Sequence, residues 1–169
     1  ATTGIDIVAE QFKIASGESI EAMEPQETGY AIEARINAER ASIDAMGQVT
    51  FQPTPGRITR CELPEREGIT LISMAAADKM VSPFYDSLII QVIAEGSDRN
   101  DAVANLASYL DDVVIEGINT NIALIKRILR DEVFLGGDYD TTYLPGFLGR
   151  TDVHSLIEEI DEAAGSRAS

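Results

Sequence analysis

The side chains able to do chemistry in this sequence form two short groups, each beside an apolar run. Glu33 and Arg35 lie two residues apart in an alternating segment, so on a strand both point to the same face. Together they would orient a polar substrate or form a structural ion pair on a solvated face, and we favour the ion pair. Asp86 and Ser87 directly precede the most apolar run, where an aspartate suits a turn cap or a supporting role better than catalysis.

Three further features lack the spacing that their chemistry requires. Gly136, Gly137 and Asp138 have no following lysine, and no strand leads into a helix there, so they are not a phosphate loop. Cys61 and His154 are the only cysteine and histidine, and neither has neighbours at metal-ligand spacing. We therefore predict no metal site, no Cys/His catalytic pair and, because a lone cysteine has no internal disulfide partner, a reducing compartment.

The elements that position these residues are predicted from periodicity. Residues 30–37 alternate between apolar and polar and predict a strand. Further strands are predicted at 57–63 and 68–73, after a Pro/Gly turn at 53–56. The apolar run at 88–94 has the length of a strand buried on both faces. Because no helices separate these strands, we expect antiparallel pairing.

Helices are predicted before and after the strands in the sequence. One spans about residues 5–15, a second begins after the capping residue Asp98, and a third runs from Thr120 towards the glycines at 136–137. Helices grouped with an antiparallel sheet make the predicted fold α+β.

The chain has the length of one domain, which we assign to residues 1–149, followed by a tail at 150–169. In the tail, Thr151 would cap an amphipathic helix before a frayed end at 165–169. The apolar face of that helix, which we expect to pack on the domain or a partner, consists of Val153, Leu156, Ile157 and Ile160.

The charge balance limits the partners. The net charge of −16 argues against nucleic acid and against anionic membrane surfaces, both of which need a basic footprint. No apolar run approaches the roughly 20 residues of a membrane span, and no signal peptide is visible. We therefore expect a cytoplasmic protein.

Five sequence strings stand in a fixed order along the chain. They are TGIDIV (3–8), GYAIEARINAE (29–39), PTPGRIT (53–59), PFYDS (83–87) and IEGINTN (115–121). In this order and spacing they resemble the C-terminal domain of a biotin carboxylase, over about residues 3–144. The resemblance implies an antiparallel β-sheet with flanking helices. In that family an ATP-grasp module precedes this domain, so we expect the chain to be a domain fragment.

The resemblance also implies a function for the parent enzyme. That enzyme, for example an acyl-CoA or pyruvate carboxylase, would carboxylate protein-linked biotin with bicarbonate, ATP and Mg²⁺. The implied partners are the ATP-grasp module of the same chain, a biotin carboxyl carrier domain, a carboxyltransferase and a second copy of the enzyme. The chain alone would be inactive and without a cofactor. Two alternatives remain open: a degenerate assembly domain, and the C-terminal domain of another ATP-grasp carboxylate ligase.

The resemblance gives Thr70 particular weight. The family carries an arginine at this position that stabilises the biotin enolate, and a threonine hydroxyl has no charge with which to do so. Arg66, four residues earlier, is an alternative cation under a shifted alignment. Gln91 stands where the family has lysine, and Tyr30 where it has histidine. Together these departures suggest altered chemistry.

The remaining residues that the resemblance singles out are supporting ones. A role in holding the site is implied for Glu33, Arg35, Asp86 and Ser87, and contact with the adenine of ATP is implied for Thr141 and Thr142.

Overall fold

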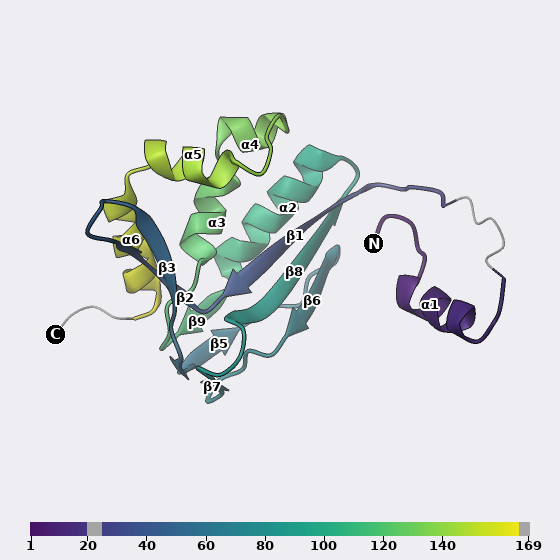
Figure 1. The fold of residues 1–169 in the computed structure, drawn as a ribbon, viewed down its shortest axis with the longest axis horizontal. Coiled ribbons are helices and arrows are strands. Elements are labelled where there is room, and N and C mark those ends of the chain that lie inside the picture. Colours follow the sequence, from purple (N-terminus) through teal and green to yellow (C-terminus); the bar gives the residue numbers. More distant parts are fainter. Residues whose placement is uncertain (20–24, 166–169) are drawn as a thin grey trace.

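The structure is a computed structural model that describes residues 1–19 and 25–165. The predicted frayed end lies almost entirely outside the described residues. Figure 1 shows helices gathered on one side of a twisted sheet, with the first helix set apart beyond it. The helices and antiparallel strands confirm the predicted α+β class.

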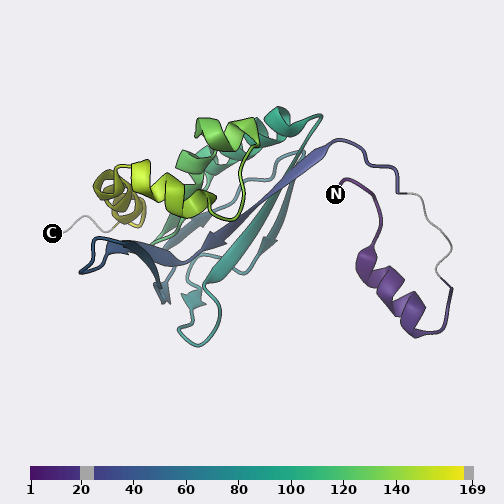
Figure 2. The ribbon, with the colours of Figure 1, turned by 45° about the horizontal axis from the view of Figure 1, so that its top comes forward.

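The central sheet has three antiparallel strands in the order β1-β8-β6. These strands are β1 (Tyr30–Asn37), β8 (Leu88–Gly96) and β6 (Ile69–Ser73). Helix α2 (Arg99–Asp112) packs against one face of the sheet, as Figure 2 shows. We call this the covered face, and the opposite one the open face.

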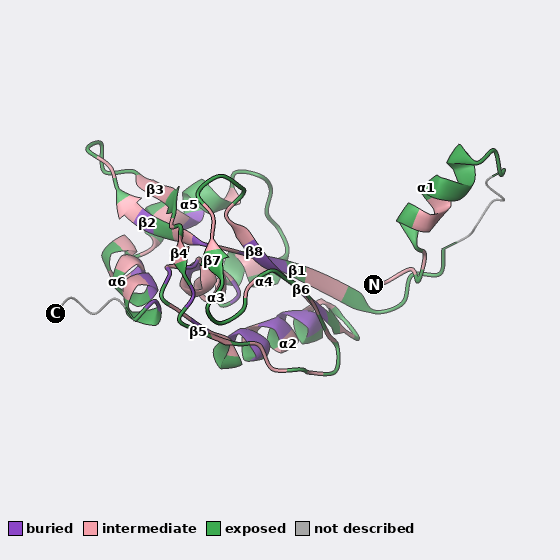
Figure 3. Ribbon diagram, turned by 90° about the horizontal axis from the view of Figure 1, so that it is seen from below, coloured by how far each residue is buried: buried purple, intermediate pink, exposed green. Residues whose placement is uncertain are grey.

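The covered face forms the main core because its residues alternate along each strand. Ile36 of β1 and Ile90 and Val92 of β8 are buried there against Leu106 and Leu110 of α2. Figure 3 shows the buried stripe of α2 that results. On the opposite side of β8, Ile89 is buried but Gln91 and Ile93 are only half-buried, so the predicted burial on both faces holds at the start of the strand and not along its length.

The shorter strands form three two-stranded ladders around this core. These ladders are β2 (Glu39–Ile43) with β3 (Val49–Pro53), β4 (Gly56–Arg57) with β7 (Met80–Val81), and β5 (Arg60–Glu62) with β9 (Val114–Glu116). The predicted strand at 57–63 is therefore two strands. The break occurs at the fully buried Ile58, whose N–H donates to the carbonyl of Lys79 and whose carbonyl accepts from the N–H of Asp78.

The described helices besides α2 are α1 (Ile7–Ala15), α3 (Ile122–Ile128), α4 (Glu132–Gly136), α5 (Tyr143–Arg150) and α6 (Val153–Ala163). The predicted cap of α2 is confirmed, since the Asp98 side chain accepts from the N–H of Asp101. The cap of α6 is Asp152 rather than the predicted Thr151. Helix α5 was not predicted. Its Pro145 is tolerated because the first N–H groups of a helix have no intrahelical acceptor.

Helix α6 belongs to a second, smaller core. Leu156 and Ile160 are buried with Ala41 of β2, Leu124 of α3 and Phe147 of α5. The predicted apolar face therefore packs on the domain itself. The predicted first helix is present as α1, but by contrast with α6 none of its residues is buried. None of the described helices is long and apolar enough to cross a membrane.

Two residues of the IEGINTN string explain why that segment is fixed. Gly117 has a φ of +94°, and a Cβ there would lie 2.4 Å from the carbonyl oxygen of Arg57, so only glycine fits. Asn121 bonds the outer edge of β1: its amide nitrogen donates to the carbonyl of Arg35 at 3.1 Å, and its amide oxygen accepts from the N–H of Asn37 at 2.9 Å.

Candidate functional site

The open face of the sheet collects most of the polar residues selected from the sequence. Strand register places Glu33 opposite Ile93 and Ile93 opposite Thr70, so these three side chains form one row across the sheet. A neighbouring row holds Arg35, Gln91 and Ile72. In Figure 2 the helices lie on the other side of the sheet. Thr70, Glu33 and Arg35 are all exposed.

Within the open face, Glu33 pairs with a glutamine rather than with Arg35. The amide nitrogen of Gln91 donates to a Glu33 carboxylate oxygen at 2.7 Å. Among the residues that the structure describes, no carboxylate lies within ion-pair distance of Arg35. The predicted ion pair between Glu33 and Arg35 is therefore wrong. Gln91 stands opposite Arg35 and diagonally across from Glu33, and its long side chain bridges that diagonal to bind the Glu33 carboxylate.

Arg66 lies on the covered side. Its guanidinium donates to the Ser108 hydroxyl at 3.1 Å, forms an ion pair with Asp112 and lies 5.5 Å above the ring centroid of Tyr109. All three partners belong to α2. The structure therefore does not bring Arg66 to the face that carries Thr70, because the acidic end of α2 holds the side chain on the other side.

Asp86 and Ser87 hold the junction between β1, β2 and β8. The Asp86 carboxylate accepts from the N–H of Leu88 at 2.7 Å, as expected of a turn cap. The Ser87 hydroxyl donates to Glu39 at 2.6 Å, and the Ser87 carbonyl accepts from the N–H of Ala38 at 2.7 Å. Two of the five sequence strings therefore meet here, GYAIEARINAE through Ala38 and Glu39 and PFYDS through Ser87.

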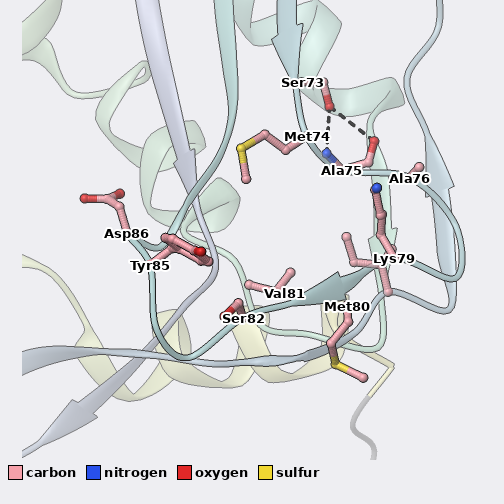
Figure 4. A pocket seen from close by; sticks show the side chains of 11 residues that line it. Ser73, Met74, Ala75, Ala76, Lys79, Met80, Val81, Ser82, Tyr85 and Asp86 are labelled. Atoms are coloured by element: carbon pink, nitrogen blue, oxygen red, sulfur yellow. Dashed lines mark hydrogen bonds between the residues drawn. The ribbon is translucent and has the colours of Figure 1, made fainter.

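A cavity of about 610 Å³ lies where β6 ends and β8 begins (Figure 4). Its walls are mainly apolar, and Met74 and Tyr85 are 68% and 80% exposed. Asp86 lines it on one side, and Lys79, which has no ion-pair partner among the described residues, lines it on another. The cavity is suited to an apolar group with a polar end. Sequence reasoning missed it because its residues come from several turns, although the adjacent aromatics of PFYDS were a usable signal.

Thr141 and Thr142 lie between α4 and α5, on the helix side of the molecule (Figure 1). The Thr142 hydroxyl donates to Asp140 at 2.7 Å, and Thr141 is exposed. A cavity of about 390 Å³ beside them is lined by Tyr139, Tyr143 and Arg150, among others. Thr70, in contrast, lies on the open face, so the sequence-selected residues fall into two regions.

A polar network fixes this second region. One carboxylate oxygen of Asp131 accepts from Arg150 at 2.8 Å and from the Tyr143 hydroxyl at 3.1 Å. Burial and the bond to Asp131 raise the pKa of Tyr143 to about 12. Burial also acts to raise the pKa of Asp131, but its bonds to Arg150, to the N–H of Phe134 and to Tyr143 outweigh that effect and leave the pKa lowered.

Among the residues that the structure describes, the side chains of the two remaining candidates have no hydrogen-bond or ion-pair partner. Cys61 is half-buried in β5, and burial raises the pKa of its thiol, which keeps it in the weakly nucleophilic neutral form. His154 is exposed on α6. Within residues 1–19 and 25–165, no three His, Cys, Asp or Glu side chains converge as metal ligands would.

The fold and the site together define a one-sided α+β domain, with helices on one face of its sheet and polar side chains on the other. The family model described as "Biotin carboxylase C-terminal domain" matches residues 33–146. The chain belongs to this family, as the five strings predicted.

Curated relatives and solved structures agree. The chain is 41% identical over 149 residues to the biotin carboxylase of Allochromatium vinosum, covering 87% of this chain and 32% of that protein. Identity to the Pseudomonas aeruginosa biotin carboxylase is 38%, with the same coverage. A Campylobacter jejuni biotin carboxylase complex superposes with a TM-score of 0.75 at 32% identity, covering 85% of this chain and 31% of that one. The chain thus spans about a third of the length of these relatives.

Proposed function

We propose that this chain is the C-terminal domain of a biotin-dependent carboxylase, whose parent enzyme carboxylates protein-linked biotin with bicarbonate and ATP. The observation that supports this most strongly is membership of the family, at 41% identity to a biotin carboxylase, together with the polar open face. A similar solved domain, the biotin carboxylase domain dimer of Hydrogenobacter thermophilus 2-oxoglutarate carboxylase, is described with MgADP and bicarbonate.

The described residues fit only some of the groups that such an enzyme uses. Thr70, Arg35 and Gln91 offer hydroxyl, guanidinium and amide donors on one face, which suits a small oxyanion. The cavity with Tyr139 and Tyr143 suits the ring side of a nucleotide, beside Thr142. No carboxylate cluster among the described residues suits Mg²⁺, and no phosphate loop is present, so groups for Mg²⁺ and the phosphates would come from elsewhere in the enzyme.

The residues of this chain would contribute by donating a hydrogen bond to the reacting group and by holding the strands of the site in register. Thr70 would donate one hydroxyl hydrogen bond towards developing negative charge, while Asp86 and Ser87 keep β8 in register beside it. The partners that follow are an ATP-grasp module in the same polypeptide, a biotin carboxyl carrier domain, a carboxyltransferase and a second copy. A non-catalytic assembly domain is the second candidate, and the uncharged Thr70 and Gln91 favour it.

A domain replacement tests this proposal. We expect a chimaera in which this chain replaces the matching third of the Allochromatium vinosum enzyme to cleave ATP in a biotin- and bicarbonate-dependent way. Thr70→Arg should raise the rate, since one preorganised donor is typically worth about 10²–10³ in rate. Met46→Arg, at the exposed tip of the β2–β3 hairpin, is the matched control for added charge. A folded chimaera without turnover, unrescued by Thr70→Arg, would favour the assembly domain.

The isolated chain provides a second test. We expect calorimetric titration with Mg-ATP to show no tight binding, because the acidic chain repels a polyanion and lacks a phosphate loop. A sub-micromolar dissociation constant, roughly −8 kcal/mol, would contradict the proposed division of labour.

A further inference from the structure

The side chain of Asn121 serves a strand rather than its own helix. Asn121 immediately precedes α3, and its carbonyl accepts from the N–H of Ile125. Asparagine is favoured at the start of a helix because its side-chain oxygen can accept from the first free N–H groups. The Asn121 side chain makes no such bond. Its amide is directed to β1 instead.

Three hydrogen bonds join Asn121 to the outer edge of β1. The amide nitrogen donates to the Arg35 carbonyl at 3.1 Å, and the amide oxygen accepts from the N–H of Asn37 at 2.9 Å. The backbone N–H of Asn121 donates to the Asn37 carbonyl at 3.2 Å. A neighbouring strand would bond these same backbone groups. Asn121 therefore takes the place of a strand at this point.

These bonds act where β1 is least regular. The register of β1 with β8 shifts between Ile36 and Asn37. Before the shift, β1 carries Glu33 and Arg35 on the open face, and after it the chain continues into β2. β1 is also an outer strand of the three-stranded sheet. Because a bulge disrupts the ladder and an outer strand lacks a second partner, the direction of β1 here depends on Asn121.

The other end of this link leads to the helix side of the molecule. Helix α3 continues to Asp131, which caps α4 and accepts from Tyr143 and Arg150. Tyr143 and Arg150 line the cavity that suits the ring of a nucleotide. Asn121 thus lies where the strand of the open face meets the segment that leads to this cavity.

We propose that Asn121 is a positioning residue for the reaction of the parent enzyme: it fixes β1 against α3, and so sets the side chains of the open face relative to the cavity on the helix side. This rests on the proposed function and adds to it a residue that acts through the backbone of β1. A merely structural contact would affect stability and leave the kinetics of the folded enzyme unchanged.

The kinetic test uses the chimaera with the Allochromatium vinosum enzyme, well below its melting temperature. Asn121→Ala removes both side-chain bonds, and kcat for biotin-dependent ATP cleavage should fall about 10- to 100-fold, since a misplacement of about 1 Å has effects of this size. The KM for ATP should be unchanged, because Asp131 still holds its cavity. Asn121→Asp keeps the acceptor for Asn37 and loses the donor, so its kcat should fall between.

Asn105→Ala is the matched control. Asn105 also lies on a helix and donates to a strand, since its amide nitrogen bonds the carbonyl of Glu95 at 2.9 Å. Its loss removes the same kind of contact near the other end of β8 and should leave kcat unchanged. In a folded chimaera that turns over, an unchanged kcat in Asn121→Ala, or an equal fall in Asn105→Ala, would overturn the inference and leave the proposed function standing.

An NMR measurement on the isolated chain covers a chimaera that does not turn over. The side-chain amide of Gln91 reports on the open face through its bond to Glu33. Asn121→Ala should shift this resonance and speed the hydrogen exchange of the Asn37 N–H, whereas Asn105→Ala should do neither. A shift in Asn121→Ala alone, without turnover of the chimaera, would reject the proposed function and retain the coupling of Asn121 to the open face. An unshifted Gln91 resonance would reject the positioning role.

Discussion

The two faces of the central sheet use the same three strands for different purposes. On the covered face, Ile36, Ile90 and Val92 are almost completely buried against α2. On the open face, Glu33, Arg35 and Thr70 are exposed to solvent. Since neighbouring residues of a strand point in opposite directions, one position separates a residue that holds the domain together from one that is free to bind. Substitutions on the two faces should therefore have separable effects.

Removal of α6 is expected to have the largest effect on stability. Truncation after Gly149 deletes Leu156 and Ile160, which are buried on the helix side. Each fully buried aliphatic side chain contributes about 1.5–3 kcal/mol, so we expect the melting temperature to fall sharply or the chain to remain unfolded. Thermal unfolding followed by circular dichroism measures this. An unchanged melting temperature would show that the helix side extends only as far as α5.

Adjacent residues of β8 test the two faces directly. Ile90→Ala should lower the free energy of unfolding by about 2–5 kcal/mol, because Ile90 is 1% exposed and a cavity remains. Gln91→Ala removes only a half-exposed hydrogen bond to Glu33, so we expect a loss of about 0.5 kcal/mol. Urea titration of both variants gives the difference, and equal losses would contradict the distinction between the faces.

A polar residue on the helix side should also contribute to stability. Asp131→Asn weakens the network with Arg150 and Tyr143, and we expect a loss of about 1 kcal/mol at neutral pH. Because the pKa of Asp131 is lowered in the folded state, its stabilisation is present above the ordinary carboxyl pKa near 4 and disappears as the pH falls below it. Urea titrations from pH 7 to pH 2.5 should show the two proteins converging. A constant difference would place the effect in packing.

The periodicity of the sequence predicted the strand at 30–37 and its buried face, because burial alternates with a period that is visible locally. The start of α2 at Asp98 was also predictable, because a cap acts on N–H groups within three residues and is therefore a local signal. The break at Ile58 could not be predicted, because it depends on backbone partners about twenty residues away. Helix α5 was concealed by Pro145 and Gly146, which usually mark turns.

The site residues divide in a similar way. The resemblance located Thr70, and strand alternation placed Glu33 and Arg35 together. The partners of these residues depend on register and tertiary packing, so the sequence assigned Glu33 to Arg35 rather than to Gln91. For the same reason, the contacts of Arg66 with α2 were not foreseen. The pairing of Asn121 with β1 joins residues more than eighty positions apart, beyond any local pattern.

The most direct test compares Thr70 and Leu71, which are neighbours on β6 with side chains on opposite faces. In the chimaera, Thr70→Arg should raise the rate of biotin-dependent ATP cleavage by about 10² or more while leaving the free energy of unfolding within about 0.5 kcal/mol. Leu71→Ala should lower the free energy of unfolding and leave the activity of the folded enzyme unchanged. If Thr70→Arg leaves the rate unaltered, or if Leu71→Ala alone alters it, the open face is not the face that takes part in the chemistry.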